Sequence, residues 1–257
     1  MASIPRVVLA GGAAKPDLQA ATGQSVRALV EVGGKTLLQT ILQAVSEDDA
    51  PVAVVGNVPP QGRSHSIPDS GDFVTNVTSG LTHFRSAPFV LLATSDLPFI
   101  TSAAVVDFVE RAVSTAGSGQ TAMVWPIVEV AKCYQRYPGV KRTALKLREG
   151  EFTGGNLMLV RPEAILEKQS QIADAYASRK SPLRIAALLG MGTVLRLAIS
   201  QIVMPSAMGL RYLEQRVSAL LGAGARAVIS PYPEIATDLD RASDFAAVSY
   251  LEERSHK

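Results

Sequence analysis

The sequence predicts a single α/β domain with a mostly parallel sheet that is covered by helices on both faces. In residues 6–127, short apolar runs alternate with segments whose apolar residues recur at helical spacing. The apolar runs are almost continuous, which is typical of strands that are buried on both faces. The chain has 257 residues, enough to bury a core without disulfides.

The first half of the chain carries this alternation of strands and helices. Strands are predicted over residues 6–10, 52–55, 89–93 and 121–127. Helices are predicted over residues 35–45, 74–84 and 102–113. Residues 57–72 are rich in Pro, Gly and Ser and are expected to form a loop.

The second half of the chain is less regular, and residues 128–152 are mixed and basic. Strands are predicted over residues 156–160 and 226–230. Helices are predicted over residues 162–177, 182–221 and 243–253, the first of them beginning with a proline.

We interpret residues 178–225 as a helical insert within one domain that spans residues 1–257. The apolar side chains of this insert are most simply part of the core. A lid or acceptor pocket, a membrane-surface contact and a face of a possible homodimer are the alternatives.

Composition excludes several classes of protein. Hydrophobic residues make up 47% and charged residues 19%, which is globular and excludes disordered or collagen-like chains. The 25 basic and 23 acidic residues give a formal charge of +2, so no nucleic-acid partner is expected. No stable membrane span is expected either, because the most apolar long stretch, residues 183–208, contains Arg184 and Arg196. The single cysteine, Cys133, cannot form an internal disulfide, and it favours a cytoplasmic protein.

Residues suited to ligand binding follow the predicted strands directly. Gly11 and Gly12 end the first strand, where glycine lets backbone N–H groups approach a ligand, although a tight turn would use them equally. Asp96 follows the strand at 89–93, at the edge where ligands of open α/β sheets bind. A carboxylate there can hold Mg²⁺, although an aspartate in a turn before a proline is also common.

A second acidic group lies near the end of the chain. Asp238 and Asp240 are two residues apart, so in an extended segment their side chains share a face. The alternative is helix capping, because Asp240 or Ser243 could start the last predicted helix, and an acid near its N-terminus, such as Asp244, suits the helix dipole.

Together these motifs resemble a known family. The chain holds, in order, Leu9-Ala10-Gly11-Gly12, Arg27-Ala28-Leu29, Gly34-Lys35-Thr36-Leu37-Leu38, Ser95-Asp96-Leu97-Pro98 and Asp238-Leu239-Asp240. This order resembles the nucleotidyltransferases related to the molybdenum-cofactor guanylyltransferase (MobA-like) and the sugar-1-phosphate nucleotidyltransferases. The resemblance covers about residues 4–177 and 226–250, and Thr153-Gly154-Gly155-Asn156 matches a segment that often faces the acceptor.

The resemblance implies a Rossmann-like, three-layer (GT-A-like) nucleotidyltransferase domain. Such an enzyme moves a nucleoside monophosphate from a nucleoside triphosphate to a phosphorylated small-molecule acceptor, releases pyrophosphate and uses Mg²⁺. The implied catalytic residues are Arg27, Asp96 and Lys15, and the implied Mg²⁺ ligands are Asp96 and Asp240. The implied nucleotide-binding residues are Ala10, Gly11, Gly12, Arg27, Asn76 and Gly80, and the implied acceptor-binding residues are Arg142, Gly155 and Asn156.

The sequence departs from the family pattern after its first glycines. The loop reads Ala13-Ala14-Lys15-Pro16-Asp17 and runs long, so Lys15 would replace the usual arginine, and Arg27 stands where a lysine is usual. A nucleotide-binding protein without turnover is therefore one alternative. A nucleotide-sugar glycosyltransferase is another, although it predicts an Asp-x-Asp motif, and Asp96 is flanked by Ser95 and Leu97.

Overall fold

The structure is a computed structural model. It describes residues 3–46, 49–60, 62–117, 119, 121–178, 193–194, 200–201 and 207–255. Half of the predicted insert at 178–225 therefore falls outside the described residues.

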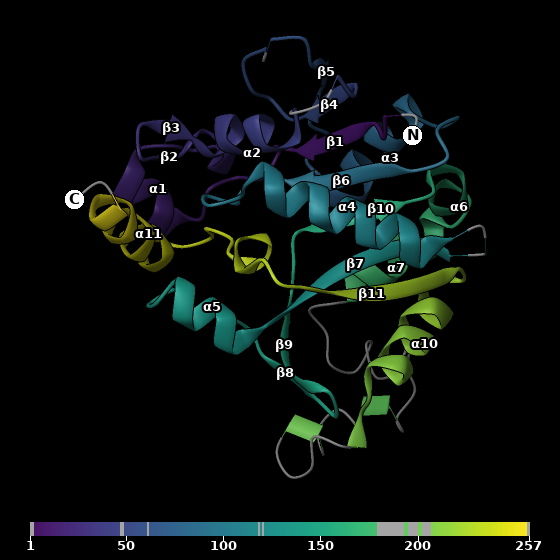
Figure 1. The fold of residues 1–257 in the computed structure, drawn as a ribbon. Helices are drawn as coiled ribbons and strands as arrows, with labels where there is room; N and C mark the ends of the chain where they lie inside the picture. Colours follow the sequence, from purple (N-terminus) through teal and green to yellow (C-terminus); the bar gives the residue numbers. More distant parts are fainter. Residues whose placement is uncertain are drawn as a thin grey trace.

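A nine-stranded sheet forms the centre of the part that the structure describes (Figure 1). Its order is β5 (His65–Ile67), β4 (Val52–Val55), β1 (Arg6–Leu9), β6 (Val90–Thr94), β10 (Leu157–Val160), β7 (Thr121–Glu129), β9 (Gly150–Gly154) and β8 (Leu145–Leu147), and β11 (Gly224–Ser230) pairs with β7. Strands β5, β4, β1 and β6 are parallel neighbours, as are β7 and β11. Strand β10 runs antiparallel between β6 and β7. The predicted mostly parallel sheet is confirmed.

Helices and a small hairpin surround this sheet. The helices are α1 (Pro16–Thr22), η1 (Arg27–Leu29), α2 (Leu37–Val45), α3 (Phe73–His83), α4 (Ser102–Ala116), α5 (Val130–Arg136), α6 (Pro162–Leu166), α7 (Gln169–Ser178), α10 (Leu210–Leu221), η3 (Pro233–Ala236) and α11 (Ala242–Ser255). The hairpin pairs β2 (Glu31–Val32) with β3 (Lys35–Thr36). No described helix has the length and the apolar composition that crossing a bilayer requires.

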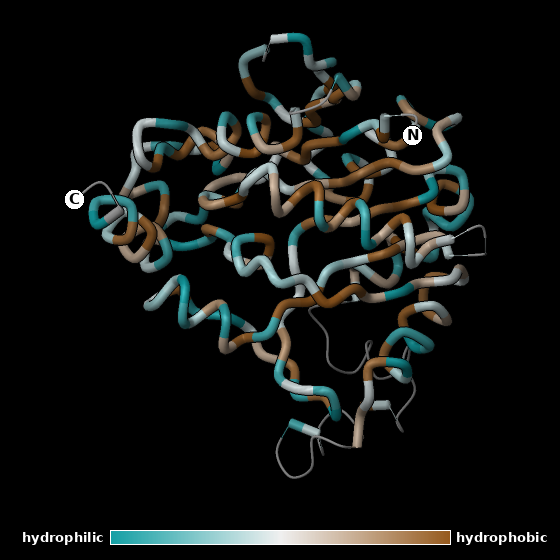
Figure 2. The backbone as a smooth tube through the Cα atoms, in the orientation of Figure 1, coloured by the Kyte–Doolittle hydropathy of each residue, from teal (hydrophilic) through white to brown (hydrophobic). Residues whose placement is uncertain are grey.

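The alternation of side chains along β1 explains the three layers. Val8 packs in one buried cluster with residues of α2 and α4, such as Leu38 and Phe108. Val7 packs in a second buried cluster on the other face, with Leu81 of α3 among its members. Successive side chains of a strand point to opposite faces, so a continuous apolar run supplies both layers. Hydrophobic stretches accordingly follow the central strands, and the outer loops are hydrophilic (Figure 2).

Several predicted boundaries change in the structure. The helix predicted from residue 35 begins at Leu37, because Thr36 caps it: the Thr36 hydroxyl accepts from Gln39 N at 3.1 Å. The loop predicted over residues 57–72 contains the edge strand β5. The basic segment 128–152 forms α5, β8 and β9, which have no clear periodicity in the sequence.

Within the predicted insert, α10 lies along the outer edge of β11. The Glu214 carboxylate accepts from Ala227 N at 2.9 Å, and the Ser218 hydroxyl accepts from Ala225 N at 2.9 Å. Glu214 is buried, and its other oxygen is 3.3 Å from the Arg226 guanidinium. Helix side chains thus bind edge N–H groups that would otherwise need a strand or water.

Candidate functional site

Several of the residues predicted to carry function lie at the carboxyl edge of the sheet, where β1 and β6 end. Ser95 N donates to Leu9 O at 3.1 Å, and Leu239 N donates to Asp96 O at 2.8 Å. Leu239 is fully buried in a cluster with Leu18 and Tyr137. This buried side chain anchors the 237–240 segment beside the end of β6.

Two cations and two carboxylates form a cluster at this edge. Arg27 NH1 lies 3.3 Å from Asp96 Oδ2 and 2.5 Å from Asp240 Oδ1. The Lys15 ammonium forms an ion pair with the second oxygen of Asp240. Arg27 N also donates to Gly12 O at 2.9 Å, which brings η1 against the Gly11-Gly12 segment after β1. Segments far apart in the sequence thus meet in one charge-balanced group.

Asp96 is the most buried acid of this cluster, with 6% of its surface exposed. Burial raises the pKa of Asp96, and the nearby Arg27 guanidinium and the Thr94 hydroxyl, which donates at 2.5 Å, oppose that rise. A buried carboxylate of this kind needs a positive partner in order to stay ionised.

Asp240 and Asp244 take different roles. Asp244 accepts from Arg241 N at 2.9 Å and from Asp240 N at 3.2 Å, at the start of α11. Asp244 is therefore the capping residue that the sequence allowed. The Asp240 side chain faces Arg27 and Lys15.

The two glycines leave room for other side chains. A Cβ on Gly11 would lie 2.5 Å from Asp69 Oδ1 and 3.0 Å from Asn76 Nδ2. A Cβ on Gly12 would lie 2.7 Å from Arg27 NH2. The glycine pair therefore lets polar side chains cross the end of β1.

Asn76, on α3, organises the loop above Gly11. Its amide donates to Asp69 Oδ1 at 2.6 Å and accepts from Ser70 N at 2.9 Å. Sequence reasoning missed Asp69, which lay in a segment interpreted only as a polar loop. A local signal exists, because Asp69 Oδ1 also accepts from Gly71 N at 3.0 Å, and Gly71 has a φ of 77°.

Other predicted nucleotide-binding residues have different surroundings. Ala10 is fully buried in the core, and its N donates to Val55 O at 2.7 Å. A Cβ on Gly80 would clash with the Val7 side chain, so Gly80 packs α3 closely against β1. Nucleotide binding at Gly80 stays a prediction.

Arg142 is paired with an acid, and its binding of an acceptor stays a prediction. Only 5% of its side chain is exposed, and its guanidinium forms an ion pair with the Asp238 carboxylate. Arg142 NH2 donates to Asp238 O at 3.2 Å as well. Arg142 thus contacts Asp238, and both residues line the same pocket.

Gly155 and Asn156 connect β9 to β10. A Cβ on Gly155 would lie 2.5 Å from Ile235 Cγ2, so this position packs against η3. Asn156 N donates to Ile235 O at 2.9 Å, and Asn156 O accepts from Thr94 N at 3.2 Å. These backbone contacts give Gly155 a packing role, whereas acceptor contact by the Asn156 side chain stays a prediction.

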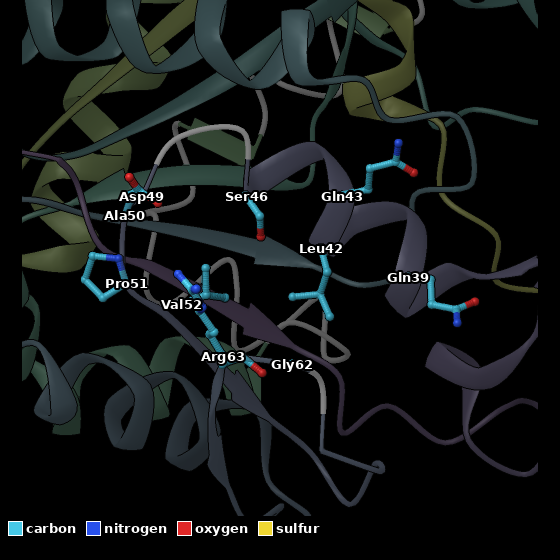
Figure 3. Close-up of a pocket in the computed structure, with 11 residues that line it drawn as sticks. Gln39, Leu42, Gln43, Ser46, Asp49, Ala50, Pro51, Val52, Gly62 and Arg63 are labelled. Atoms are coloured by element: carbon cyan, nitrogen blue, oxygen red, sulfur yellow. The ribbon is translucent and has the colours of Figure 1, made fainter.

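A pocket of about 670 Å³ opens beside the charge cluster. Its lining includes Lys141, Thr153, Asp238, Asp240 and Arg241. A different pocket, shown in Figure 3, lies at the amino ends of β4 and β5 and is lined by residues such as Leu42, Val52 and Arg63. None of the predicted site residues lines that second pocket.

The donor set limits what metal could bind. Among the described residues, no group of three or more His, Cys, Asp or Glu could hold a metal ion. Asp96 and Asp240 nevertheless both contact one nitrogen of Arg27, so a single positive centre already reaches both carboxylates. Two carboxylates are sufficient for Mg²⁺ when phosphate oxygens complete its shell. The residues fit a metal that arrives with a phosphate ligand.

A mostly parallel sheet with glycines, cations and carboxylates at its carboxyl edge defines a nucleotide-binding α/β class of protein. Residues 6–173 match the family model described as the MobA-like NTP transferase domain. The chain belongs to this family of nucleotidyltransferases.

Solved structures support the assignment. A hypothetical transferase from Thermus thermophilus is 32% identical, with a TM-score of 0.82 over 94% of this chain and 99% of that chain. A 2-C-methyl-D-erythritol 4-phosphate cytidylyltransferase, also from Thermus thermophilus, is 18% identical, with a TM-score of 0.53 over 96% and 98%. A CMP:2-keto-3-deoxy-manno-octonic acid synthetase complexed with CTP is 12% identical, with a TM-score of 0.56 over 99% and 100%. The last two show the fold alone, and no curated protein matches the chain.

Proposed function

We propose that this protein is a Mg²⁺-dependent nucleotidyltransferase. It would move a nucleoside monophosphate from a nucleoside triphosphate to a phosphorylated small molecule and release pyrophosphate. The observation that carries this proposal is the position of Arg27 NH1 between Asp96 and Asp240, at the glycine-bearing end of β1. Two carboxylates of the kind that bind Mg²⁺, Asp96 and Asp240, thus lie beside Arg27, a guanidinium of the kind that binds phosphate.

The reaction requires little covalent chemistry from the protein. An oxygen of the acceptor phosphate attacks the α-phosphorus, the bond from that phosphorus to the bridging oxygen breaks, and pyrophosphate leaves with the electron pair. Positioning and charge neutralisation supply most of the catalysis in such a transfer. Mg²⁺ held by Asp96 and Asp240 would neutralise charge on the phosphates.

Arg27 and Lys15 are the groups that would bind the leaving pyrophosphate. Both are now paired with Asp240 and are partly exposed, with 24% and 38% of their side chains accessible. When a cation reaches Asp240, these two side chains become available to phosphate oxygens. The planar guanidinium of Arg27 can donate to two phosphate oxygens at once, whereas the ammonium of Lys15 would attract phosphate as a point charge.

The acceptor would bind in the pocket beside Asp238 and Asp240. Lys141 and Arg241 line it, and neither side chain has an ion pair with another residue in the described ranges. Together with Arg142, which lines the same pocket, they are the candidate ligands of the acceptor phosphate. The Thr153 hydroxyl on the same wall offers a hydrogen bond to a hydroxylated acceptor.

We further propose a cytoplasmic location. Cys133 is free and buried, and burial raises the pKa of its thiol. A thiol kept in this protonated form is inert, as suits a structural cysteine of a reducing compartment.

Thermal unfolding with each of ATP, GTP, CTP and UTP, with and without Mg²⁺, tests the proposal. A ligand present at about 100 times its Kd adds about 2.7 kcal/mol of stability, which raises Tm by several degrees. We expect one nucleotide to stabilise the wild type only with Mg²⁺, and Asp96→Asn to lose that gain. Pyrophosphate release with candidate phosphorylated acceptors would follow.

A matched control keeps the result specific. Glu163→Gln removes a carboxylate that is 69% exposed on α6 and lies 4.0 Å from Arg85, away from the charge cluster. This variant should keep the whole Mg²⁺-dependent gain. If no nucleotide stabilises the wild type in the presence of Mg²⁺, the proposal is wrong. A nucleotide-dependent gain without pyrophosphate release for any acceptor would favour a binding protein without turnover.

A further inference from the structure

The two carboxylate oxygens of Asp96 have different partners. The hydroxyl of Thr94, two residues earlier at the end of β6, donates to Asp96 Oδ1 at 2.5 Å. The other oxygen, Oδ2, lies 3.3 Å from Arg27 NH1, and that nitrogen lies closer to Asp240 Oδ1, at 2.5 Å. One oxygen of Asp96 is therefore bonded to a neutral hydroxyl of the sheet, and the other faces a charged side chain that also contacts Asp240.

Thr94 is itself held in place by the strands on both of its sides. It is the last residue of β6 and pairs in register with Leu9 of β1. Its N–H donates to Asn156 O at 3.2 Å, just before β10 begins. A β-branched side chain also has a restricted χ1 angle. The Thr94 hydroxyl therefore has a defined position relative to the sheet.

The backbone of Asp96 is anchored as well, which leaves its carboxyl group as the part that can turn. Asp96 O accepts from the N–H of Leu239, a fully buried residue, at 2.8 Å. The χ2 angle of an aspartate has broad preferences, so the backbone alone does not fix the plane of the carboxylate. A hydrogen bond to Oδ1 sets this rotation, and it thereby sets the position of Oδ2.

The contact with Thr94 differs from the contact with Arg27 in what a bound nucleotide would change. Under the proposed function, Arg27 turns to phosphate oxygens and leaves Asp96 and Asp240 to a metal ion. Thr94 carries no charge, so it leaves the negative charge of Asp96 available to that ion. Because its backbone belongs to the sheet, Thr94 keeps its place when Arg27 moves.

We propose that Thr94 is a positioning residue that fixes the Asp96 carboxylate so that Oδ2 faces the Mg²⁺ ion held with Asp240. This inference rests on the proposed function. Arg27 NH1 contacts Asp96 Oδ2 and Asp240 Oδ1, so a cation in the place of this nitrogen would meet the same two oxygens. Groups that hydrogen-bond to a metal ligand orient it, and they affect metal affinity without contacting the ion.

Variants of Thr94 test this inference through metal dependence. The readout is the Mg²⁺ concentration that gives half of the nucleotide-dependent rise in Tm, using the nucleotide that stabilises the wild type. Thr94→Val and Thr94→Ala both lose the hydroxyl and should raise this concentration about 10-fold. Thr94→Ser keeps a hydroxyl and should stay near the wild-type value. The matched control is Thr82→Val, which removes an exposed hydroxyl that donates to Thr78 O at 2.7 Å on α3, and it should change nothing.

A double-mutant cycle shows whether Thr94 acts through Asp96. In high Mg²⁺, Asp96→Asn and the double variant Thr94→Val/Asp96→Asn should bind the nucleotide with the same Kd, because the amide no longer holds the ion. If Thr94→Val weakens binding by the same factor in both backgrounds, the hydroxyl acts independently of Asp96 and the inference is wrong.

The remaining outcomes separate this inference from a structural role and from the proposed function. If Thr94→Val and Thr94→Ala lower only the Tm of the free protein and keep the wild-type Mg²⁺ requirement, Thr94 merely supports the fold. If Thr94→Ser is as impaired as Thr94→Val, the hydroxyl is not the group that matters. A wild type that gains nothing from any nucleotide refutes the proposed function, and this inference with it.

Discussion

The Gly11 side of the candidate site is held by hydrogen bonds of one buried amide, whereas the Asp96 side is held by ion pairs. Asn76 is 8% exposed and joins Asp69 to Ser70 above the end of β1. Lys15 and Asp240, on the other side, are about a third exposed. Buried hydrogen bonds stabilise a fixed geometry, and exposed ion pairs exchange partners with little change in stability. The Gly11 side is therefore suited to keep the shape of a ligand site, and the Asp96 side is suited to bind a charged ligand.

Breaking the Asn76 network should have the largest effect on stability. Asn76→Ala removes the hydrogen bonds that the amide makes with the Asp69 carboxylate and with Ser70 N, and the loss of these two bonds costs about 1–3 kcal/mol. Tm should fall by several degrees. Asn76→Asp is a second test of the network, because it keeps the size of the side chain and places a carboxylate next to that of Asp69. If Asn76→Ala unfolds like the wild type in urea, the network does not stabilise the fold.

The pH dependence of Asp96 gives a smaller effect with a defined sign. Its folded pKa is raised above the ordinary 3.8, so the folded state binds more protons than the unfolded state between these two values. The stability contributed by this group therefore falls as pH rises through that window. Asp96→Asn cannot titrate, so its stability relative to wild type should increase with pH above 3.8. Urea unfolding of both proteins at several pH values measures this difference, and a constant difference would contradict it.

Removing Lys15 should have the smallest effect on stability. Its ion pair with Asp240 is exposed, with 38% and 32% of the two side chains accessible, so Lys15→Met should cost less than about 1 kcal/mol. The same variant should clearly weaken the Mg²⁺-dependent gain from nucleotide, because one phosphate-binding cation is lost. Lys35→Met, an exposed lysine on β3 that bonds to Gln43, is the matched control. An unchanged nucleotide gain in Lys15→Met would remove Lys15 from the site.

The sequence is enough to predict that Gly11 and Asp96 lie at one edge, because each follows a strand and the carboxyl ends of strands in an open parallel sheet share one edge. The place of Asp240 beside them is expected only from the family resemblance. The order of the motifs then identifies the family. What these residues bind stays a prediction, because nothing in the fold by itself selects a metal or a base.

The missed features depend on contacts that local patterns do not contain. Arg142 and Asp238 are 96 positions apart, so a basic run in the sequence gave no sign that one member is buried. Gly80 lies on a helix face whose neighbour is β1, and only the packed structure shows that Val7 leaves no space for a side chain. The strand β5 has three residues and an exposed edge, too short for a periodic signal.

The contact between α10 and β11 has a consequence for behaviour at high protein concentration. An unsatisfied strand edge is a template on which a second molecule can extend the sheet. Glu214 and Ser218 occupy N–H groups of that edge, so incoming strands find fewer free donors. We therefore expect helix α10 to limit edge-to-edge association of this sheet. We expect Glu214→Ala to become turbid during heating or refolding, while the contacts at the carboxyl ends of β1 and β6 remain intact.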